Sequence, residues 1–312
     1  MQALPVKKIL VIRLSALGDV IQTFPAFQAI RQHHPEAHIT VMTTSPYVAL
    51  LKQSQIFDEV WAHSRIKLHK IREVLDFRRQ LLAAGFDRVY DLQLSQRTSF
   101  YYYLMGGKFS SVQWVGRASG ATVRFIEPTA FEINTFDRHQ ALLAPFGMRL
   151  QKPDLRYLST PLNIDVPKPY VVIVPGASNT FGGAKKWPQT HYAALCCYLV
   201  TQNIMPIIVG GLGEDNSLLL KSCPQAIDLT GQTSLTDIIA LAKDASLVIG
   251  NDTGPMHLAS ASLAEVLILF SGKTNAEKAL ARDEKIHWMQ EENIADLYPD
   301  TVVKQVEKIF NK

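Results

Sequence analysis

The sequence lacks the features that mark membrane-spanning and secreted proteins. No apolar run approaches the roughly 18–20 residues that a transmembrane helix needs. The three cysteines form no C-x-x-C pair, and this sparse, odd set favours a reducing cytoplasm over a disulfide framework. The start of the chain, residues 1–12, is only a short apolar run interrupted and bounded by Lys7, Lys8 and Arg13, so we expect a first strand there and not a signal segment.

Several catalytic motifs are also missing. The chain has no D-x-D, H-E-x-x-H or G-x-S-x-G, so metal-dependent and serine-hydrolase chemistry have no support. The first βα turn has a single glycine, Gly18, which argues against an NAD-dependent oxidoreductase with a G-x-G-x-x-G fingerprint. The P-loop-like F-S-G-K-T at 270–274 has Leu267 where the earlier glycine belongs. We expect no metal and no cofactor.

Composition and charge indicate a globular protein with two unlike halves. The chain has 312 residues, of which 47% are hydrophobic and 19% charged, which suits one large or two ordinary domains. Residues 1–165 hold 20 Lys and Arg against 13 Asp and Glu, a net of +7, whereas residues 166–312 hold 12 against 15, a net of −3. A basic first half predicts an anionic partner there.

Strand and helix patterns alternate along the chain, which predicts βαβ units and parallel sheets. The expected strands cover residues 8–13, 38–42, 59–62, 88–92, 112–115, 170–174, 205–209, 226–228, 246–249 and 265–270. The expected helices cover residues 19–33, 46–53, 70–83, 97–105, 189–201, 212–221, 235–243, 255–262 and 300–310.

A polar stretch with four prolines, residues 151–169, interrupts this alternation and is typical of a linker. We therefore expect an α/β protein with two Rossmann-like doubly wound domains, 1–160 and 161–312. Ligands bind at the carboxyl ends of parallel strands, so two such domains facing each other would enclose a central cleft.

The segment Val248–Ser262, V-I-G-N-D-T-G-P-M-H-L-A-S-A-S, predicts a strand, a glycine-rich turn and a helix that Pro255 opens. The free N–H groups and the dipole of such a helix start favour a phosphate, and His257 in the first turn can add a donor. A capped loop without a ligand explains this segment equally well.

Two loops that follow other strands carry ligand-type residues. Pro175–Pro188, P-G-A-S-N-T-F-G-G-A-K-K-W-P, combines glycines that let a backbone approach phosphate with the cations of Lys185 and Lys186. A solvated loop accounts for the lysines about as well. Glu214 follows V-G-G-L-G and could accept hydrogen bonds from ribose hydroxyls. An acidic residue favoured by the helix dipole in the first turn of a helix explains it equally well.

In the basic half, Asp19 closes the first βα turn, R-L-S-A-L-G-D, either as a helix N-cap or as a general base. The run Arg65–Arg79 interleaves cations with apolar residues. It is either a solvated amphipathic helix or a surface for anionic lipid or sugar phosphate.

Taken together, four motifs resemble the bacterial ADP-heptose:lipopolysaccharide heptosyltransferases, glycosyltransferase family 9. They are K-I-L-V-I-R-L-S-A-L-G-D at 8–19, D-L-Q-L-S-Q-R-T at 91–98, P-G-A with A-K-K-W-P at 175–188, and G-N-D-T-G-P-M-H-L-A at 250–259. The resemblance implies the GT-B fold and a metal-independent, inverting glycosyltransferase. The donor ADP-heptose would bind the C-terminal domain, and the Kdo/heptose–lipid A inner core of lipopolysaccharide would bind the N-terminal one.

The resemblance also assigns roles to residues. Asp19 would take the acceptor proton, and Lys185 would face the donor diphosphate. The remaining donor residues would be Ser178, Thr180, Glu214, Asp252, Thr253, Gly254 and His257. We expect the acceptor to meet Arg65, Lys67, Lys70, Arg72, Gln93 and Arg97.

These assignments predict a cytoplasmic enzyme, with peripheral contact at the cytoplasmic face of the inner membrane and no nucleic acid among its partners. Two alternatives stay open: a family 9 transferase that uses another nucleotide sugar, and a nucleotide-sugar-binding protein without catalysis.

Overall fold

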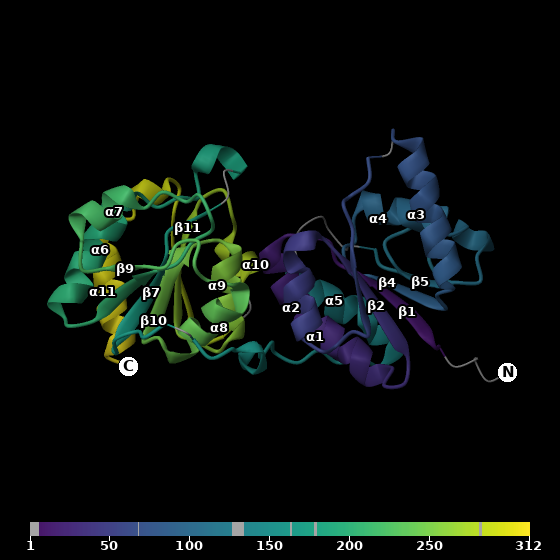
Figure 1. Ribbon diagram of the computed structural model, residues 1–312, viewed down its shortest axis with the longest axis horizontal. Helices are drawn as coiled ribbons and strands as arrows, with labels where there is room; N and C mark the ends of the chain where they lie inside the picture. Colours follow the sequence, from purple (N-terminus) through teal and green to yellow (C-terminus); the bar gives the residue numbers. More distant parts are fainter. Residues whose placement is uncertain (1–5, 68, 127–133, 163, 178–179, 281–282) are drawn as a thin grey trace. The chain divides into compact units, whose positions relative to one another are not determined.

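The chain forms two compact units, Met1–Lys152 and Pro153–Lys312 (Figure 1). We call them unit 1 and unit 2. A computed structural model describes residues 6–67, 69–126, 134–162, 164–177, 180–280 and 283–312. The two units divide after residue 152, where the sequence predicts a division after residue 160.

Unit 1 is built on a six-stranded parallel sheet with strand order β3-β2-β1-β4-β5-β6. Its strands are β1 (Lys8–Ile12), β2 (His38–Thr43), β3 (Glu59–Ala62), β4 (Arg88–Asp91), β5 (Gln113–Gly116) and β6 (Val123–Arg124). The helices are α1 (Leu17–His33), α2 (Val48–Gln53), α3 (Ile71–Ala84), α4 (Gln96–Leu104) and α5 (Thr135–Leu143). Short 3₁₀ turns are η1 (Ser45–Tyr47), η2 (Gly107–Phe109) and η3 (Ala144–Phe146).

Unit 2 repeats this plan with strand order β12-β11-β10-β7-β8-β9, again all parallel. Its strands are β7 (Tyr170–Val174), β8 (Met205–Ile208), β9 (Ile227–Asp228), β10 (Leu247–Asn251), β11 (Val266–Ser271) and β12 (Ile286–Glu291). The helices are α6 (Gln189–Thr201), α7 (Ser217–Ser222), α8 (Leu235–Asp244), α9 (Gly254–Ala261), α10 (Ala276–Ala279) and α11 (Pro299–Phe310). Its 3₁₀ turns are η4 (Arg156–Leu158), η5 (Thr180–Gly183) and η6 (Ile294–Asp296).

Each sheet has one point where the strand order reverses, and a doubly wound sheet binds its ligand there. In unit 1 the reversal lies between β1 and β4, which pair in register from Ile9–Arg88 to Ile12–Asp91. In unit 2 it lies between β7 and β10, which pair from Val171–Leu247 to Val174–Gly250. The loops that leave these four strands therefore form the expected ligand sites of the two units.

The central strands are apolar on both faces because helices cover both sides of each sheet. All five residues of β7 and all five of β10 are buried. The end of β10 is packed so closely that a Cβ on Gly250 would lie 2.6 Å from the Cβ of Val174, so only glycine fits there. This packing fixes where the turn after β10 begins.

The structure departs from the sequence prediction at several elements. The helix predicted at Leu212–Lys221 is wrong over its first half, since α7 begins only at Ser217. Gly213, with a φ of 84°, keeps residues before it in a loop. Four further helices and strands, β6, α5, α10 and β12, were not predicted from the sequence; β12 is an edge strand whose burial does not alternate. Within the described residues, no helix is both long and apolar enough to cross a membrane.

Helix α5 lies against α1 and carries His139 into the core of unit 1. His139 is fully buried, and its Nε2 lies 3.0 Å from the backbone oxygen of Leu92, at the end of β4. That carbonyl can only accept, so Nε2 carries the proton of the neutral ring. Burial, together with the nearby charge of Arg13, lowers the pKa of His139 to about 3.

His139 predicts that the protein loses stability in mild acid. Above the unfolded pKa of 6.5, the lowered pKa of the buried imidazole does not change the free energy of unfolding. Below it, only the unfolded chain takes up the proton, so the free energy of unfolding falls. At pH 5 this amounts to about 2 kcal/mol. Chemical denaturation should therefore show that the free energy of unfolding falls between pH 7.5 and pH 5 in the parent protein. In His139→Gln this fall should be smaller by about that amount. An equal loss in both proteins would contradict this role.

Candidate active site

The turn after β1 places Asp19 in the first turn of α1. Its Oδ2 accepts a hydrogen bond of 3.0 Å from the backbone N–H of Ala16, which is the N-cap residue. The interpretation of Asp19 as the N-cap is therefore wrong, because it caps from the third helical position. Its Oδ1 lies 3.1 Å from Nη2 of Arg13, and the side chain remains 45% exposed. A carboxylate that is oriented from two sides and still open to solvent suits a general base.

Two polar side chains brace this turn from the strands around it. Arg13 is 5% exposed, and its Nη1 donates to the backbone oxygen of Leu92 at 2.7 Å. Burial lowers the pKa of Arg13, while the carboxylate of Asp19 opposes that shift. Oε1 of Gln93 accepts from the backbone N–H of Leu14 at 2.8 Å. Gln93, expected to contact the acceptor, thus uses its amide oxygen to hold the turn.

The other five expected acceptor residues fall into two groups. Arg65 and Asp19 both act electrostatically on the hydroxyl of Tyr47: the charge of Arg65 lowers its pKa and that of Asp19 raises it, so both charges lie within range of this hydroxyl. Arg97 belongs to the same region, because its Nη1 donates to the backbone oxygen of Ile66 at 2.9 Å. The second group comprises Lys67, Lys70 and Arg72, which are exposed before and at the start of α3; Nζ of Lys70 pairs with Glu73 at 2.6 Å.

In unit 2, the turn after β10 gathers the expected donor residues into one cluster. Nζ of Lys185 lies 2.5 Å from Oδ2 of Asp252, and Nε2 of His257 lies 3.7 Å from Oδ1 of the same carboxylate. Burial raises the pKa of Asp252, but the hydrogen bond from His257 and the ion pair with Lys185 outweigh it and bring the pKa to about 2. The ionised carboxylate therefore holds two donors at the amino end of α9, whose N-cap is Thr253 and whose first residue is Gly254.

Asn251 connects this cluster to the loop after β7. Its side chain is fully buried; Nδ2 donates to the backbone oxygen of Pro175 at 2.7 Å, and Oδ1 accepts from the backbone N–H of Trp187 at 3.0 Å. Trp187 is anchored in turn, since its Nε1 donates to the backbone oxygen of Leu297 at 2.7 Å. Both ends of the lysine-bearing loop are thus fixed to the last residue of β10.

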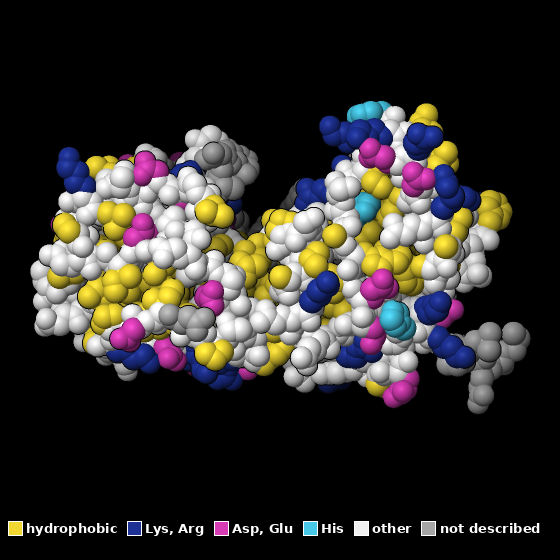
Figure 2. Space-filling view, viewed as in Figure 1, with side chains coloured by type: hydrophobic (Ala, Val, Ile, Leu, Met, Phe, Trp, Pro, Cys, Tyr) yellow, Lys and Arg dark blue, Asp and Glu magenta, His cyan; other side chains and the backbone are white. Residues whose placement is uncertain are grey.

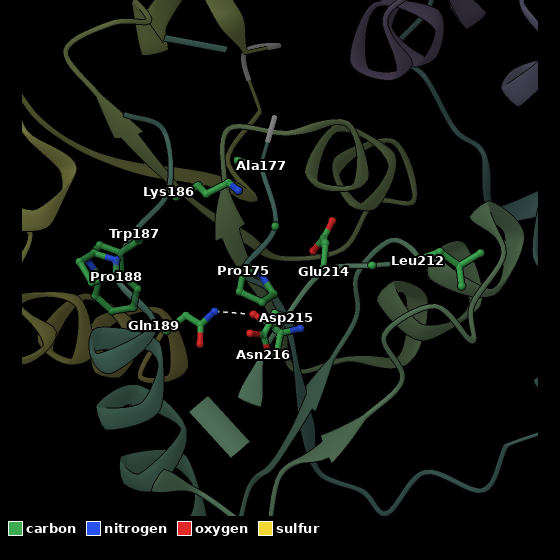
Figure 3. Close-up of a pocket in the computed structure, with 12 residues that line it drawn as sticks. Pro175, Ala177, Lys186, Trp187, Pro188, Gln189, Leu212, Glu214, Asp215 and Asn216 are labelled. Atoms are coloured by element: carbon green, nitrogen blue, oxygen red, sulfur yellow. Dashed lines mark hydrogen bonds between the residues drawn. The ribbon is translucent and has the colours of Figure 1, made fainter. Parts of the chain in front are cut away.

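The same loop borders a cavity of about 650 Å³ in unit 2 (Figure 3). Its wall includes Gly176, Lys186, Leu212 and Glu214. The prediction that Glu214 lies in the first turn of a helix is wrong, because it precedes α7 and lies in the loop. Its carboxylate lies over Gly210, where a Cβ would come within 2.6 Å of Oε2, and against Gly176 in the same way. Glycines on both sides therefore give Glu214 its place in the cavity.

The adjacent Lys185 and Lys186 side chains point to different parts of the site. Lys185 faces the Asp252 cluster with only 17% of its side chain exposed, whereas Lys186 is exposed and borders the cavity. Ser178 lies outside the described residues, as does the side chain of Thr180 at the start of η5. Across the described part of the chain, no three His, Cys, Asp or Glu side chains are grouped as metal ligands would be.

Sequence reasoning missed the roles of two residues, Arg13 and Asn251. Each is a polar residue at or just after the end of a buried strand, followed by a βα turn. Burying such a group costs free energy unless it is hydrogen-bonded, so its presence there is a usable signal of a braced loop.

Comparison with known proteins gives a consistent family. The model of glycosyltransferase family 9 (heptosyltransferase) matches residues 74–307, more than half of the chain. Lipopolysaccharide heptosyltransferase 1 of Campylobacter coli is 25% identical over 319 residues, covering 89% of this chain and 90% of that protein. Lipopolysaccharide heptosyltransferase 2 of Escherichia coli K12 is 24% identical, with coverage of 84% and 82%.

Solved structures agree on the fold. E. coli ADP-heptose lps heptosyltransferase II superposes with a TM-score of 0.74 at 22% identity, covering 97% of this chain and 98% of that one. E. coli heptosyltransferase WaaC with ADP-2-deoxy-2-fluoro heptose gives 0.75 at 18% identity, with coverage of 96% and 99%. The predicted α/β, GT-B-type fold is confirmed. The chain belongs to glycosyltransferase family 9, the heptosyltransferase family, and is a glycosyltransferase.

Proposed function

We propose that the protein is an inverting transferase that moves heptose from ADP-heptose to the Kdo/heptose inner core of lipopolysaccharide. The observation that carries the proposal is the cluster of Lys185, Asp252 and His257, which shares a loop with the cavity that holds Glu214. The cluster suits a diphosphate and the cavity suits a nucleoside, the two parts of a nucleotide-sugar donor. Heptose as the donor sugar and lipopolysaccharide as the acceptor are proposed because the aligned relatives are lipopolysaccharide heptosyltransferases.

The donor diphosphate would bind at the amino end of α9. Lys185 and His257 supply donors there, and the helix dipole adds positive potential. Thr253 and Gly254 bring backbone close to the phosphates, and Ser178 or Thr180 adds a hydroxyl. Asp252 would stay ionised and keep Lys185 in place while charge develops on the departing ADP.

The donor nucleoside would occupy the cavity. Glu214 would accept hydrogen bonds from the ribose hydroxyls. Leu212, which is 92% exposed at the cavity wall, offers an apolar surface to the adenine ring. Filling the cavity would cover this side chain, which supports a nucleoside as the occupant.

Unit 1 would bind the acceptor and supply the base. Arg65, Lys67, Lys70, Arg72 and Arg97, with Gln93, would hold its anionic groups, and Asp19 would take the proton of the attacking hydroxyl. The new glycosidic bond forms at the anomeric carbon as the bond to ADP breaks, which inverts that carbon. Arg13 positions Asp19 for this step.

We also propose a cytoplasmic enzyme that touches the cytoplasmic face of the inner membrane, where a lipid-anchored acceptor would lie. Cys196, Cys197 and Cys223 are all free thiols, which supports a reducing compartment.

A ligand panel tests the proposed donor directly. ADP and ADP-heptose should raise the melting temperature, whereas UDP, GDP and NAD should not, because the cavity would accept adenine in place of uracil or guanine and the site beyond the diphosphate would accept heptose in place of the nicotinamide riboside of NAD. A ligand at a hundredfold excess over its Kd stabilises by about 2.7 kcal/mol. Stabilisation by UDP-sugars alone would contradict ADP-heptose as the donor and would favour another nucleotide sugar. Binding of ADP-heptose without any transfer would contradict catalysis and would favour a nucleotide-sugar-binding protein.

Asp19→Asn should lower turnover by roughly 10²-fold or more while donor affinity stays nearly unchanged, because the amide cannot take a proton. The matched control is Asp237→Asn. Asp237 caps α8 from the same helical position, through a bond of 2.9 Å from the N–H of Ser234, but lies outside the site. Steady-state kinetics and donor titration should separate the two. Retained turnover in Asp19→Asn, or loss of donor binding along with it, would make Asp19 structural.

Lys185→Ala should weaken donor binding or slow turnover by a few kcal/mol, since it removes the cation between Asp252 and the diphosphate. Lys186→Ala is the neighbouring control and should cost under about 0.5 kcal/mol, as exposed charges usually do. Donor titration and kinetics on both variants measure the ranking. A larger effect of Lys186→Ala would show that Lys186 makes the phosphate contact. Small effects of both substitutions would show that the turn after β10 holds the diphosphate without either lysine.

A further inference from the structure

Helix α3 has a second apolar face that nothing in the described structure covers. Phe77 and Leu81 point into the core of unit 1. Ile71, Leu75 and Leu82 are 70%, 50% and 42% exposed, in that order. At 100° per residue, these three project within about 40° of one another, roughly a third of a turn away from the core face. They therefore form a continuous outer stripe along the helix.

Cations flank this stripe on both sides. On the same helical projection, Arg78 lies on one flank, and Arg72 and Arg79 lie on the other. The acids of α3 lie farther round the helix, where Glu73 pairs with Lys70 and Asp76 with Arg79. Residues 65–84 carry six Lys and Arg against two Asp and Glu, a net of +4. Figure 2 shows Lys, Arg and hydrophobic side chains together over α3, at the upper right.

An apolar stripe between arginines matches an anionic lipid surface. The apolar side chains can enter the boundary between headgroups and acyl chains while the guanidinium groups pair with phosphates. A second copy of this chain would instead bring the same excess of cations against itself, which is unfavourable. Nucleic acid would use the cations but would leave the stripe exposed to water.

We propose that the outer face of α3 docks on the anionic surface of a membrane. This inference rests on the proposed function, since it names the surface that meets the membrane of a lipid-anchored acceptor. The segment before α3 also belongs to the proposed acceptor region, because Arg97 donates to the carbonyl of Ile66 and the charges of Arg65 and Asp19 both act on the hydroxyl of Tyr47. A lipid-anchored acceptor would thus reach the base from the surface on which unit 1 rests.

Co-sedimentation of the full chain with vesicles tests the docking surface. The protein should sediment with phosphatidylcholine vesicles that contain phosphatidylglycerol and not with phosphatidylcholine alone, and added salt should release it. The triple variant Ile71→Ser, Leu75→Ser, Leu82→Ser should bind at least tenfold more weakly, as should Arg78→Gln, Arg79→Gln. The control Leu218→Ser, Phe310→Ser removes apolar side chains exposed on unit 2 and should bind like the parent protein.

Wild-type binding by the serine triple variant would overturn the proposal, as would no binding of the parent protein to anionic vesicles. A concentration-dependent dimer in light scattering that the triple variant abolishes would overturn it in favour of self-association. In the triple variant, stabilisation by ADP and transfer to a deacylated, soluble acceptor should stay within twofold of the parent protein. Failure of the ligand panel with vesicle binding intact would overturn the proposed donor and leave the docking surface standing.

Discussion

The buried amide of Asn251 is the interaction on which the candidate donor site depends. It ends the central strand of unit 2 and, with no exposure to water, bonds the chain at both Pro175 and Trp187. These bonds fix a glycine-rich loop that would otherwise have wide conformational freedom. The fixed loop brings Lys185 to Asp252 and borders the cavity at Lys186. A pre-ordered loop lowers the entropy lost on binding a ligand.

Unit 1 uses the same device with different chemistry. Arg13 follows β1 and donates to the carbonyl of Leu92 after β4, so it spans the reversal of strand order as Asn251 does between β10 and β7. Its other nitrogen orients Asp19. One doubly wound plan thus presents an exposed carboxylate in unit 1 and a lysine held by a carboxylate in unit 2, and the proposed mechanism would use the first for proton removal and the second for diphosphate departure.

Most strands and the two-unit architecture could be predicted from the sequence, because buried parallel strands are short apolar runs bounded by turns. The prediction was wrong at residues 212–216, which were included in the helix expected over 212–221, whereas glycines at 210, 211 and 213 favour a loop. It was also wrong about how Asp19 caps α1, since a carboxylate two or three residues into a helix looks the same in sequence as an N-cap. The brace made by Asn251 depends on residues 64 and 76 positions away, which no local pattern indicates.

The most direct test of this account is the affinity of Asn251→Ala for ADP, measured by calorimetric titration beside the parent protein. Near- and far-ultraviolet circular dichroism would establish that unit 2 stays folded. If Asn251 holds the donor loops in place, ADP binding should weaken at least tenfold, about 1.4 kcal/mol, with Lys185 and His257 unchanged in sequence. Unchanged affinity in a folded variant would show that the donor site does not depend on this amide, and would contradict the account.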